Sequence, residues 1–90
     1  MRLEWDAQQS RENLRKHGIS FEETSSVFLD PLSTTGSDPD HSVGERRYVT
    51  FGVSSFGKLL VVAHTERGNA IRIISARRTT RAERKLYEEG

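Results

Sequence analysis

The chain has 90 residues, of which 33% are hydrophobic and 30% charged, and its net charge is +1. That length suits one hydrophobic core, so we expect a single domain over residues 1–90. Cysteine is absent, which excludes disulfides, a zinc knuckle and a thiol nucleophile. No apolar run approaches the roughly 18 residues of a membrane span, and the charged N-terminus is unlike a secretory signal, so we expect a cytoplasmic protein that contacts no membrane.

Positive charge is concentrated near the C-terminus. Residues 67–90 contain seven Lys and Arg against three Asp and Glu, whereas residues 1–66 contain seven against ten. Most of the C-terminal cations are arginines, whose planar guanidinium groups bind phosphate oxygens in pairs. Two interpretations of this charge remain open at this point, a solvated surface and a binding site for a polyanion.

The first elements expected are a short strand and a helix. Residues 2–5, RLEW, predict the strand. Asp6 is well placed as the N-cap of the helix, with Gln9 three residues further on to complete a capping box. The helix is expected to end near His17, where Gly18 provides a left-handed C-cap.

A second helix is expected directly after the first. Ser20 is its predicted N-cap, and Glu23 stands at the third helical position, as in a capping box. Asp30 should end this helix, because a residue before proline is pushed out of helical geometry. The two helices are therefore expected to form a pair with a very short joint.

Residues 32–45, LSTTGSDPDHSVGE, predict a loop with one short edge strand near residues 32–35. Asp38, Asp40 and His41 in this loop offer two carboxylates and one imidazole, which form a weak chelate on a loop. We therefore expect no metal site and no cofactor.

Three strands are predicted in the second half of the chain, in the segments RRYVTFGV, KLLVVAHT and AIRIISAR. Four-residue turns would join them into an antiparallel meander, in which Val53 pairs with Lys58 and Thr65 pairs with Ala70. This register also places Arg47 beside His64 and Lys58 beside Arg77. The register is conditional on the length of both turns.

The predicted register sorts the side chains of the three strands into two faces. The helices should cover the more continuous apolar face, which contains Val49, Phe51, Val53, Leu60, Val62, Ile71 and Ile73. The opposite face is mixed and contains Tyr48, Thr50, Gly52, Leu59, Val61, Ala63, Arg72, Ile74 and Ala76. Arg72 is unusual there, because a charge in the middle of a strand needs a partner or solvent.

The chain is expected to end in a helix that starts at about Arg81. Thr80 is its predicted N-cap, and Glu83 completes the capping box. Arg77 and Arg78 stand just before this helix, where free backbone N–H groups and two guanidinium groups would converge. That combination favours an anion.

His64 is the histidine best placed for chemistry, because it ends a predicted strand close to several charged residues. A near-neutral imidazole can move a proton, although a strand-end histidine bonded to backbone is an equally good interpretation. No phosphate-binding glycine loop, zinc spacing or dinucleotide fingerprint is present. The available residue types suffice for metal-independent RNA cleavage, in which a 2′-hydroxyl attacks the adjacent phosphate and the protein supplies charge and proton transfer.

Several short blocks of the sequence together match one known pattern. In chain order they are WD (5–6), N..KHG.SFEE (13–23), VF.DP (27–31), ER (45–46), HTER (64–67), and IRIISAR followed by ER..Y (71–87). Through these blocks, which extend over almost all of its length, the chain resembles the BrnT family of type II toxins.

The resemblance implies a fold, an activity and a partner. The fold would be a small RelE-like α+β fold, with an antiparallel sheet of three to four strands packed against an N-terminal helix pair and followed by a C-terminal helix. The activity would be that of an endoribonuclease that inhibits translation. The partner would be a DNA-binding antitoxin, BrnA, which neutralises the toxin, so that contact with DNA would be indirect.

The resemblance also suggests roles for individual residues. Arg72 and Arg77 would bind the scissile phosphate, His64 would transfer a proton, Arg47 would support them, and Tyr87 would stack on a base or assist proton transfer. The ERRY segment offers either Arg46 or Arg47 for the family position. The further residues expected to bind RNA are Arg46, Arg67, Arg78 and Arg81.

Two other functions are compatible with the same residues. The chain could be a non-catalytic module whose arginines bind nucleic acid or an acidic protein segment. It could also be an inactive family member that acts as a co-repressor with its antitoxin. A homodimer and a heterotetramer with the antitoxin are both compatible with the apolar surface that the predicted fold leaves uncovered.

Overall fold

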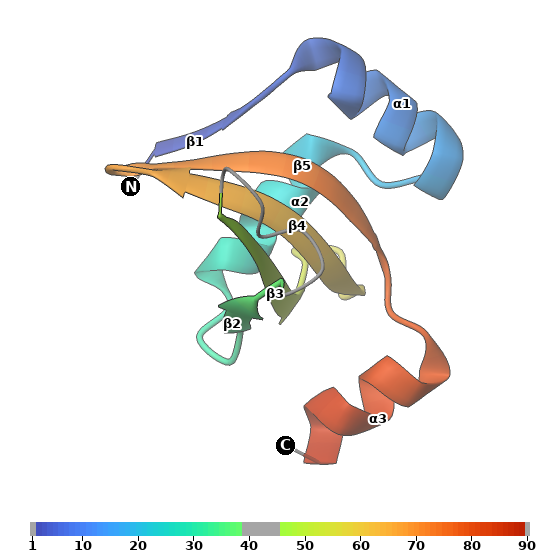
Figure 1. Ribbon diagram of the computed structural model, residues 1–90. Helices are drawn as coiled ribbons and strands as arrows, with labels where there is room; N and C mark the ends of the chain where they lie inside the picture. The colour runs from blue at the N-terminus through green and yellow to red at the C-terminus, as the bar shows by residue number, and fades with distance from the viewer. Residues whose placement is uncertain (1, 39–45, 90) are drawn as a thin grey trace.

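The computed structural model describes residues 2–38 and 46–89, which form an α+β fold. Figure 1 shows α1 above β5 and α3 beyond the end of β5, at the bottom of the view. Among the described residues, no helix is long and apolar enough to cross a membrane. The elements are β1 (Arg2–Trp5), α1 (Ala7–His17), α2 (Phe21–Ser25), the 3₁₀ helix η1 (Ser26–Leu29), β2 (Thr34–Ser37), β3 (Arg47–Val53), β4 (Leu59–Arg67), β5 (Ala70–Arg78) and α3 (Arg81–Glu89).

The sheet is mixed and has five strands in the described residues, in the order β1-β5-β4-β3-β2. β1 pairs with β5 in parallel, and the other pairs are antiparallel. The expectation of a RelE-like antiparallel sheet of three to four strands is therefore wrong in strand number and in the direction of β1. The edge strand expected near residues 32–35 is present as β2, two residues later.

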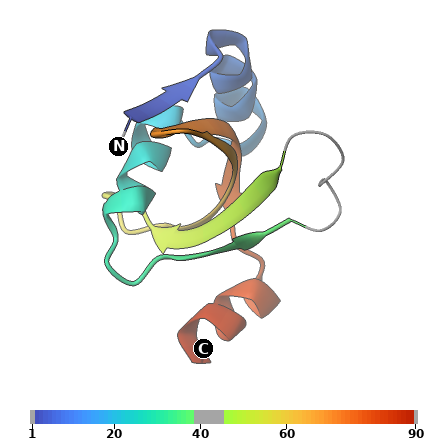
Figure 2. The same ribbon diagram turned by 60° about the vertical axis from the view of Figure 1, so that its left-hand side comes forward.

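The helices do not cover the sheet as one layer. α1 lies against β5, α2 also packs on β5, and η1 packs on β3. Figure 2 shows α3 on the other side of β2 and β3 from α2. The core between α2, η1 and the sheet consists of Ile19, Phe21, Val27, Leu60, Val62, Ile73 and Ala76, with Trp5 and Phe28 packed against it.

The predicted N-caps of the first two helices and the predicted C-cap of the first are confirmed. The second helical segment stops before Asp30 as expected, but it is α-helical only to Ser25 and continues to Leu29 as η1. The Asp6 side chain accepts a hydrogen bond from the N–H of Gln9 at 3.0 Å, and Gly18 ends α1 with a φ of 71°. The Ser20 hydroxyl accepts from the N–H of Glu23 at 3.0 Å. These caps depend on hydrogen bonds between near neighbours in the chain, which explains why the sequence predicts them well.

The hairpin between β3 and β4 is one residue out of the expected register. Val53 pairs with Leu59 rather than with Lys58. Lys58 instead belongs to the turn, which is closed by a hydrogen bond of 2.8 Å from the N–H of Ser54 to the carbonyl of Lys58. The turn therefore has five residues where four were expected.

A shift of one residue exchanges the faces of a strand, and this exchange has occurred in β3. Thr50 and Gly52 are buried, whereas Val53 is 38% exposed. Gly52 lies so close to η1 that an added Cβ would come within 2.7 Å of Val27 Cγ1. The expected position under the helices is therefore wrong for Val49, Phe51 and Val53.

The turn between β4 and β5 is shorter than expected. Arg67 pairs with Ala70, so the turn contains only residues 68–69. Gly68 has a φ of 58°, in the left-handed region that a residue without Cβ adopts readily. Four residues were expected in this turn, and the expected pair of Thr65 with Ala70 does not form.

β5 contains a β-bulge at Ile74. This residue has no partner in β4 and stands between the paired residues Ile73 and Ser75. The extra residue lets Ile73 and Ala76 both enter the core, although they are three positions apart. The expectation that Ala76 lies on the face opposite the core is therefore wrong.

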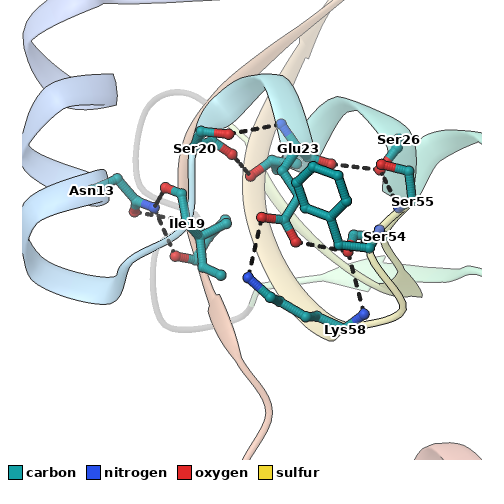
Figure 3. Close-up of polar contacts among 11 residues, drawn as sticks. Asn13, Ile19, Ser20, Glu23, Ser26, Ser54, Ser55 and Lys58 are labelled. Carbon is teal, nitrogen blue, oxygen red and sulfur yellow. Dashed lines mark hydrogen bonds and ion pairs between the residues drawn. The ribbon is translucent and has the colours of Figure 1, made fainter.

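Asn13 connects α1 to the edge of β5 through its buried amide. Its Nδ2 donates to the carbonyls of Ile19 and Ala76, both at 2.9 Å, and its Oδ1 accepts from the N–H of Ala76 at 3.0 Å. Figure 3 shows the bond of this side chain to Ile19. Because β1 ends opposite Ile73, the Asn13 amide supplies hydrogen bonds to β5 beyond the end of β1.

Glu23 connects α2 to the turn between β3 and β4. Its side chain is 4% exposed, and its carboxylate accepts from the Ser54 hydroxyl at 2.8 Å, with Lys58 Nζ at 3.5 Å (Figure 3). Beside it, Ser26 Oγ accepts from the N–H of Ser55 at 2.7 Å. The Glu23 carboxylate thus binds the turn, instead of bonding back to the N–H of Ser20 as the predicted capping box requires.

Candidate functional site

Three paired residues on neighbouring strands form a row in which a threonine stands between two arginines. Thr65 of β4 pairs with Arg72 of β5 on one side and with Arg47 of β3 on the other. Directly paired residues have Cβ atoms about 5 Å apart on the same face of a sheet. We call Arg47, Thr65 and Arg72 the arginine row. It lies on the outer face, away from the core, because the residues that alternate with it in β4 and β5 belong to the buried side.

The two guanidinium groups of the arginine row lack counter-charges within the described part of the chain. Arg47 and Arg72 are half-buried, and neither side chain makes a hydrogen bond or an ion pair with a described residue. Glu4 of β1 pairs with Arg72 in register but is not within ion-pair distance. The expected neighbour of Arg47 was His64, and the register places Thr65 there instead. Two cations without an ion-pair partner, one on each side of the same residue, attract an anion.

Thr65 stands between the two arginines as a buried polar residue. It is 3% exposed, and its Oγ1 has no hydrogen-bond partner among the described residues. A buried hydroxyl without a partner typically costs about 1–3 kcal/mol. Sequence reasoning missed this residue, because the predicted register placed Thr65 opposite Ala70.

Arg77 lies on the same face but already has a partner. Its Nη1 and Nη2 donate to the two carboxylate oxygens of Glu83 at 2.8 and 2.9 Å. The carboxylate also accepts from the N–H of Thr80 at 2.8 Å, which confirms the predicted capping box of α3. In the sheet Arg77 pairs with Val61, whereas the predicted register placed it beside Lys58. The bidentate pair fixes the start of α3 to β5.

The hydrogen bonds from Arg77 lower the pKa of Glu83 from 4.5 to about 2. Since the folded pKa is below the unfolded one, the ion pair stabilises the attachment of α3 above pH 4.5, and this stabilisation is lost as the pH falls through about 2. We expect a carboxyl carbon NMR titration of Glu83 to have its midpoint near 2, and that of the Arg77→Ala variant to return toward 4.5. An unchanged midpoint in the variant would contradict the assigned cause.

Tyr87 attaches the other end of α3. Its hydroxyl lies 3.2 Å from Asp30 Oδ2 and 3.3 Å from the carbonyl of Leu32, and it donates its proton to these acceptors. Asp30 also accepts from the N–H groups of Val53 and Leu32 at 2.8 and 3.0 Å, which lower its pKa. Burial and the Asp30 charge raise the pKa of Tyr87, so this hydroxyl is a poor base at neutral pH. Tyr87 therefore has a structural function, because it binds the end of α3 to Asp30 and Leu32.

His64 lies on the core side of the sheet, opposite the arginine row. It is 1% exposed, stacks on Tyr48 with ring centroids 5.8 Å apart, and meets Phe28 edge-on at 5.2 Å. Its Nε2 is 2.7 Å from Thr50 Oγ1, which is itself 2.7 Å from Thr35 Oγ1. Burial lowers the pKa of His64. A neutral, buried imidazole has no direct access to a ligand on the outer face.

The other arginines expected to bind RNA are all exposed. Arg46 precedes Arg47, Arg67 ends β4 at the turn, Arg78 ends β5, and Arg81 begins α3. Arg78 also accepts a hydrogen bond on its carbonyl from Arg77 Nη1 at 3.2 Å. These four residues are spread around the sheet and do not form one cluster.

The structure brings some of the predicted site residues together and separates others. Arg47 and Arg72 meet in the arginine row. Because of the bulge, Arg77 shares their face, but five residues of strand place it on the order of 15 Å from Arg72. His64 is on the other face, and Tyr87 is held near Asp30. No three His, Cys, Asp or Glu side chains in the described ranges are placed to hold a metal ion, and Asp40 and His41 lie outside those ranges.

Comparison with known proteins matches the chain to a family model and to solved structures. A family model described as the ribonuclease toxin BrnT of type II toxin-antitoxin systems matches residues 5–83. The chain is also similar to the crystal structure of the ribonuclease toxin BrnT of Brucella abortus, with 20% sequence identity and a TM-score of 0.66. That similarity covers 90% of this chain and 99% of the other. No curated protein matches the chain.

Proposed function

Because the chain belongs to the BrnT family of ribonuclease toxins of type II toxin-antitoxin systems, we propose that it is an endoribonuclease that cleaves RNA without a metal ion and so inhibits translation. Membership of this family implies an antitoxin partner. The partner proposed is a DNA-binding protein similar to BrnA, which would neutralise the toxin and provide its indirect contact with DNA. The place of action proposed is the cytoplasm.

The observation that supports cleavage at a defined place is the arginine row. Arg47 and Arg72 stand on either side of Thr65, and neither has a counter-charge among the described residues. Guanidinium groups bind phosphate oxygens bidentately and stabilise the charge that develops on a phosphate in a transition state. A phosphodiester held between these two arginines would be bound from both sides.

The proposed reaction is an internal transfer of the phosphate. The 2′-hydroxyl of a nucleotide loses its proton and attacks the adjacent phosphorus, and the bond to the 5′-oxygen of the next nucleotide breaks. The leaving oxygen takes up a proton, so that the products are a 2′,3′-cyclic phosphate and a 5′-hydroxyl. The protein has to position the phosphate and to offset its growing negative charge.

The other predicted site residues have lesser parts in this proposal. Arg77 could bind RNA after its guanidinium exchanges the Glu83 carboxylate for a phosphate. Tyr87 would act near the end of the bound RNA rather than at the scissile phosphate. The exposed arginines at positions 46, 67, 78 and 81 would contact the RNA backbone on either side, and these contacts would be sensitive to salt.

His64 is proposed to act through the sheet and not by direct proton transfer. Its ring fills the space between Phe28 and Tyr48, and its Nε2 is bonded to Thr50 in β3. These contacts hold β3 against β4, and so they hold Arg47 beside Thr65. In this role His64 is a positioning residue, and the general base for the 2′-hydroxyl would come from elsewhere on the outer face.

Purified protein incubated with a short RNA tests the proposal. We expect products with 2′,3′-cyclic phosphate and 5′-hydroxyl ends, the same yield when EDTA is present, and no cleavage of the same oligonucleotide with 2′-O-methyl groups. Mass spectrometry of the fragments identifies the ends. Fragments with 3′-hydroxyl ends, or a loss of cleavage in EDTA, would contradict the proposed mechanism.

A second candidate is a non-catalytic module that binds RNA or its antitoxin. One observation favours it: His64 is buried, and Arg77 and Tyr87 are held by Glu83 and Asp30. Binding of RNA without any cleavage in the same assay would support this candidate. Homodimers and heterotetramers with the antitoxin are both compatible with either function, and analytical ultracentrifugation of the toxin alone and with its antitoxin would distinguish them.

A further inference from the structure

The hydroxyl of Thr65 has no evident structural function. It lies in the central strand of the sheet, is 3% exposed, and its Oγ1 has no hydrogen-bond partner among the described residues. Valine has the same shape as threonine and would fill this position in a strand without burying an unpaired oxygen. A polar group retained at such a cost needs an explanation in terms of a ligand or a partner.

The surroundings of Thr65 indicate which ligand its hydroxyl could serve. Arg47 and Arg72 flank it directly on the two neighbouring strands, and their side chains have no partner within the described ranges. Arginine side chains cover neighbouring groups with their aliphatic stems and keep the charged end mobile. The register therefore places one arginine on each side of Thr65, so that both mobile guanidinium groups can reach a ligand over its hydroxyl and uncover that hydroxyl by moving apart.

We propose that Thr65 is a binding residue for RNA, and that its hydroxyl donates a hydrogen bond to a phosphate oxygen held between Arg47 and Arg72. This inference rests on the proposed function, because it assigns the phosphodiester of RNA to the arginine row. A tetrahedral phosphate can accept donors from three directions at once, whereas a planar carboxylate accepts them in one plane. The arrangement of the three donors therefore suits a phosphodiester better than an acidic peptide.

The proposal predicts that loss of the Thr65 hydroxyl weakens RNA binding but does not lower the stability of the free protein. In the free protein the hydroxyl is buried without a partner, so its removal in Thr65→Val should raise the midpoint of thermal unfolding or leave it unchanged. In the complex the hydroxyl would bond to a charged oxygen, so its removal should weaken binding of RNA about tenfold or more. Thr65→Ser keeps the hydroxyl and should bind RNA within about threefold of the wild type while being less stable, because it lacks a buried methyl group.

The experiment measures both quantities on the full chain. Fluorescence anisotropy with a labelled 2′-O-methyl RNA, which cannot be cleaved, gives Kd for the wild type, Thr65→Val and Thr65→Ser, and differential scanning fluorimetry gives their unfolding midpoints. A matched control is Thr79→Val, which removes the hydroxyl of a half-buried threonine outside the arginine row. We expect this control to bind RNA like the wild type.

Several outcomes would overturn the proposal. Unchanged binding in Thr65→Val would do so, and so would a loss of stability in that variant, because the hydroxyl would then be satisfied within the free protein. A wild type that binds no RNA would also overturn it. If Thr65→Val weakens binding of a labelled poly-glutamate peptide but not of RNA, the arginine row binds an acidic protein segment instead. The RNA in this assay cannot be cleaved, so the assay measures binding alone. If the protein binds this RNA through Thr65 but does not cleave ordinary RNA, the proposed cleavage fails and the role of Thr65 in binding stands.

Discussion

Arg72→Ala is expected to lower kcat/KM for RNA cleavage by about 100-fold or more, because the variant loses half of the positive charge that faces the scissile phosphate. Arg72 lies beside Thr65 and has no partner among the described residues. Its removal therefore breaks no hydrogen bond or ion pair with a described residue, and it should change the unfolding midpoint much less than it changes the rate. A fluorogenic RNA substrate measures the rate, and circular dichroism measures the melting curve.

Two further variants test whether the loss of rate depends on the position and geometry of Arg72 or only on positive charge. Arg72→Lys keeps the charge but loses the bidentate geometry, so its rate should fall between those of the wild type and Arg72→Ala. Arg84→Ala removes an exposed arginine of α3 that forms an ion pair with Glu88, and it should cleave RNA at nearly the normal rate. If Arg72→Ala and Arg84→Ala lower the rate equally, the arginine row has no special part in the reaction, and general positive charge explains the activity.

Asn13→Ala is expected to lower the free energy of unfolding by about 3–5 kcal/mol, because it leaves three buried backbone groups without partners. The groups are the carbonyl of Ile19 and both the N–H and the carbonyl of Ala76. A domain of this size has a total stability of only about 5–13 kcal/mol. The variant should therefore be partly unfolded at 37 °C and should appear inactive for structural reasons.

Urea denaturation followed by Trp5 fluorescence measures this effect, since Trp5 packs edge-on against Phe21 in the core at 6.0 Å. Glu12→Ala is the matched control, because it removes an exposed side chain from the same helix and should change the free energy of unfolding by less than about 0.5 kcal/mol. A small effect of Asn13→Ala would mean that water can replace the hydrogen bonds of the Asn13 side chain to Ile19 and Ala76.

The sequence predicted those features that depend on near neighbours in the chain. The caps at Asp6, Gly18, Ser20 and Thr80 formed as expected, because each is set by hydrogen bonds or a dihedral angle within one helical turn. The strands in the second half were also located closely. The match to the family blocks identified the family, which the family model over residues 5–83 confirms.

The features that were mispredicted depend on contacts between distant residues or on the length of turns. β1 pairs in parallel with β5, far away in the sequence, and nothing within residues 2–5 indicates this partner. Both turns differ in length from expectation, and each error changed which residues stand opposite one another. The candidate site is sensitive to this, because Thr65 joins Arg47 and Arg72 only in the observed register.

The bulge at Ile74 has a consequence for how strand sequences are interpreted. Arg72 and Arg77 are separated by an odd number of positions, and in a regular strand such residues point in opposite directions. Here both point outward, because one inserted residue resets the alternation between them. An odd spacing between side chains that must act together on one strand is thus itself a signature of an insertion. A pattern search that imposes strict alternation would place Arg77 on the face opposite Arg72.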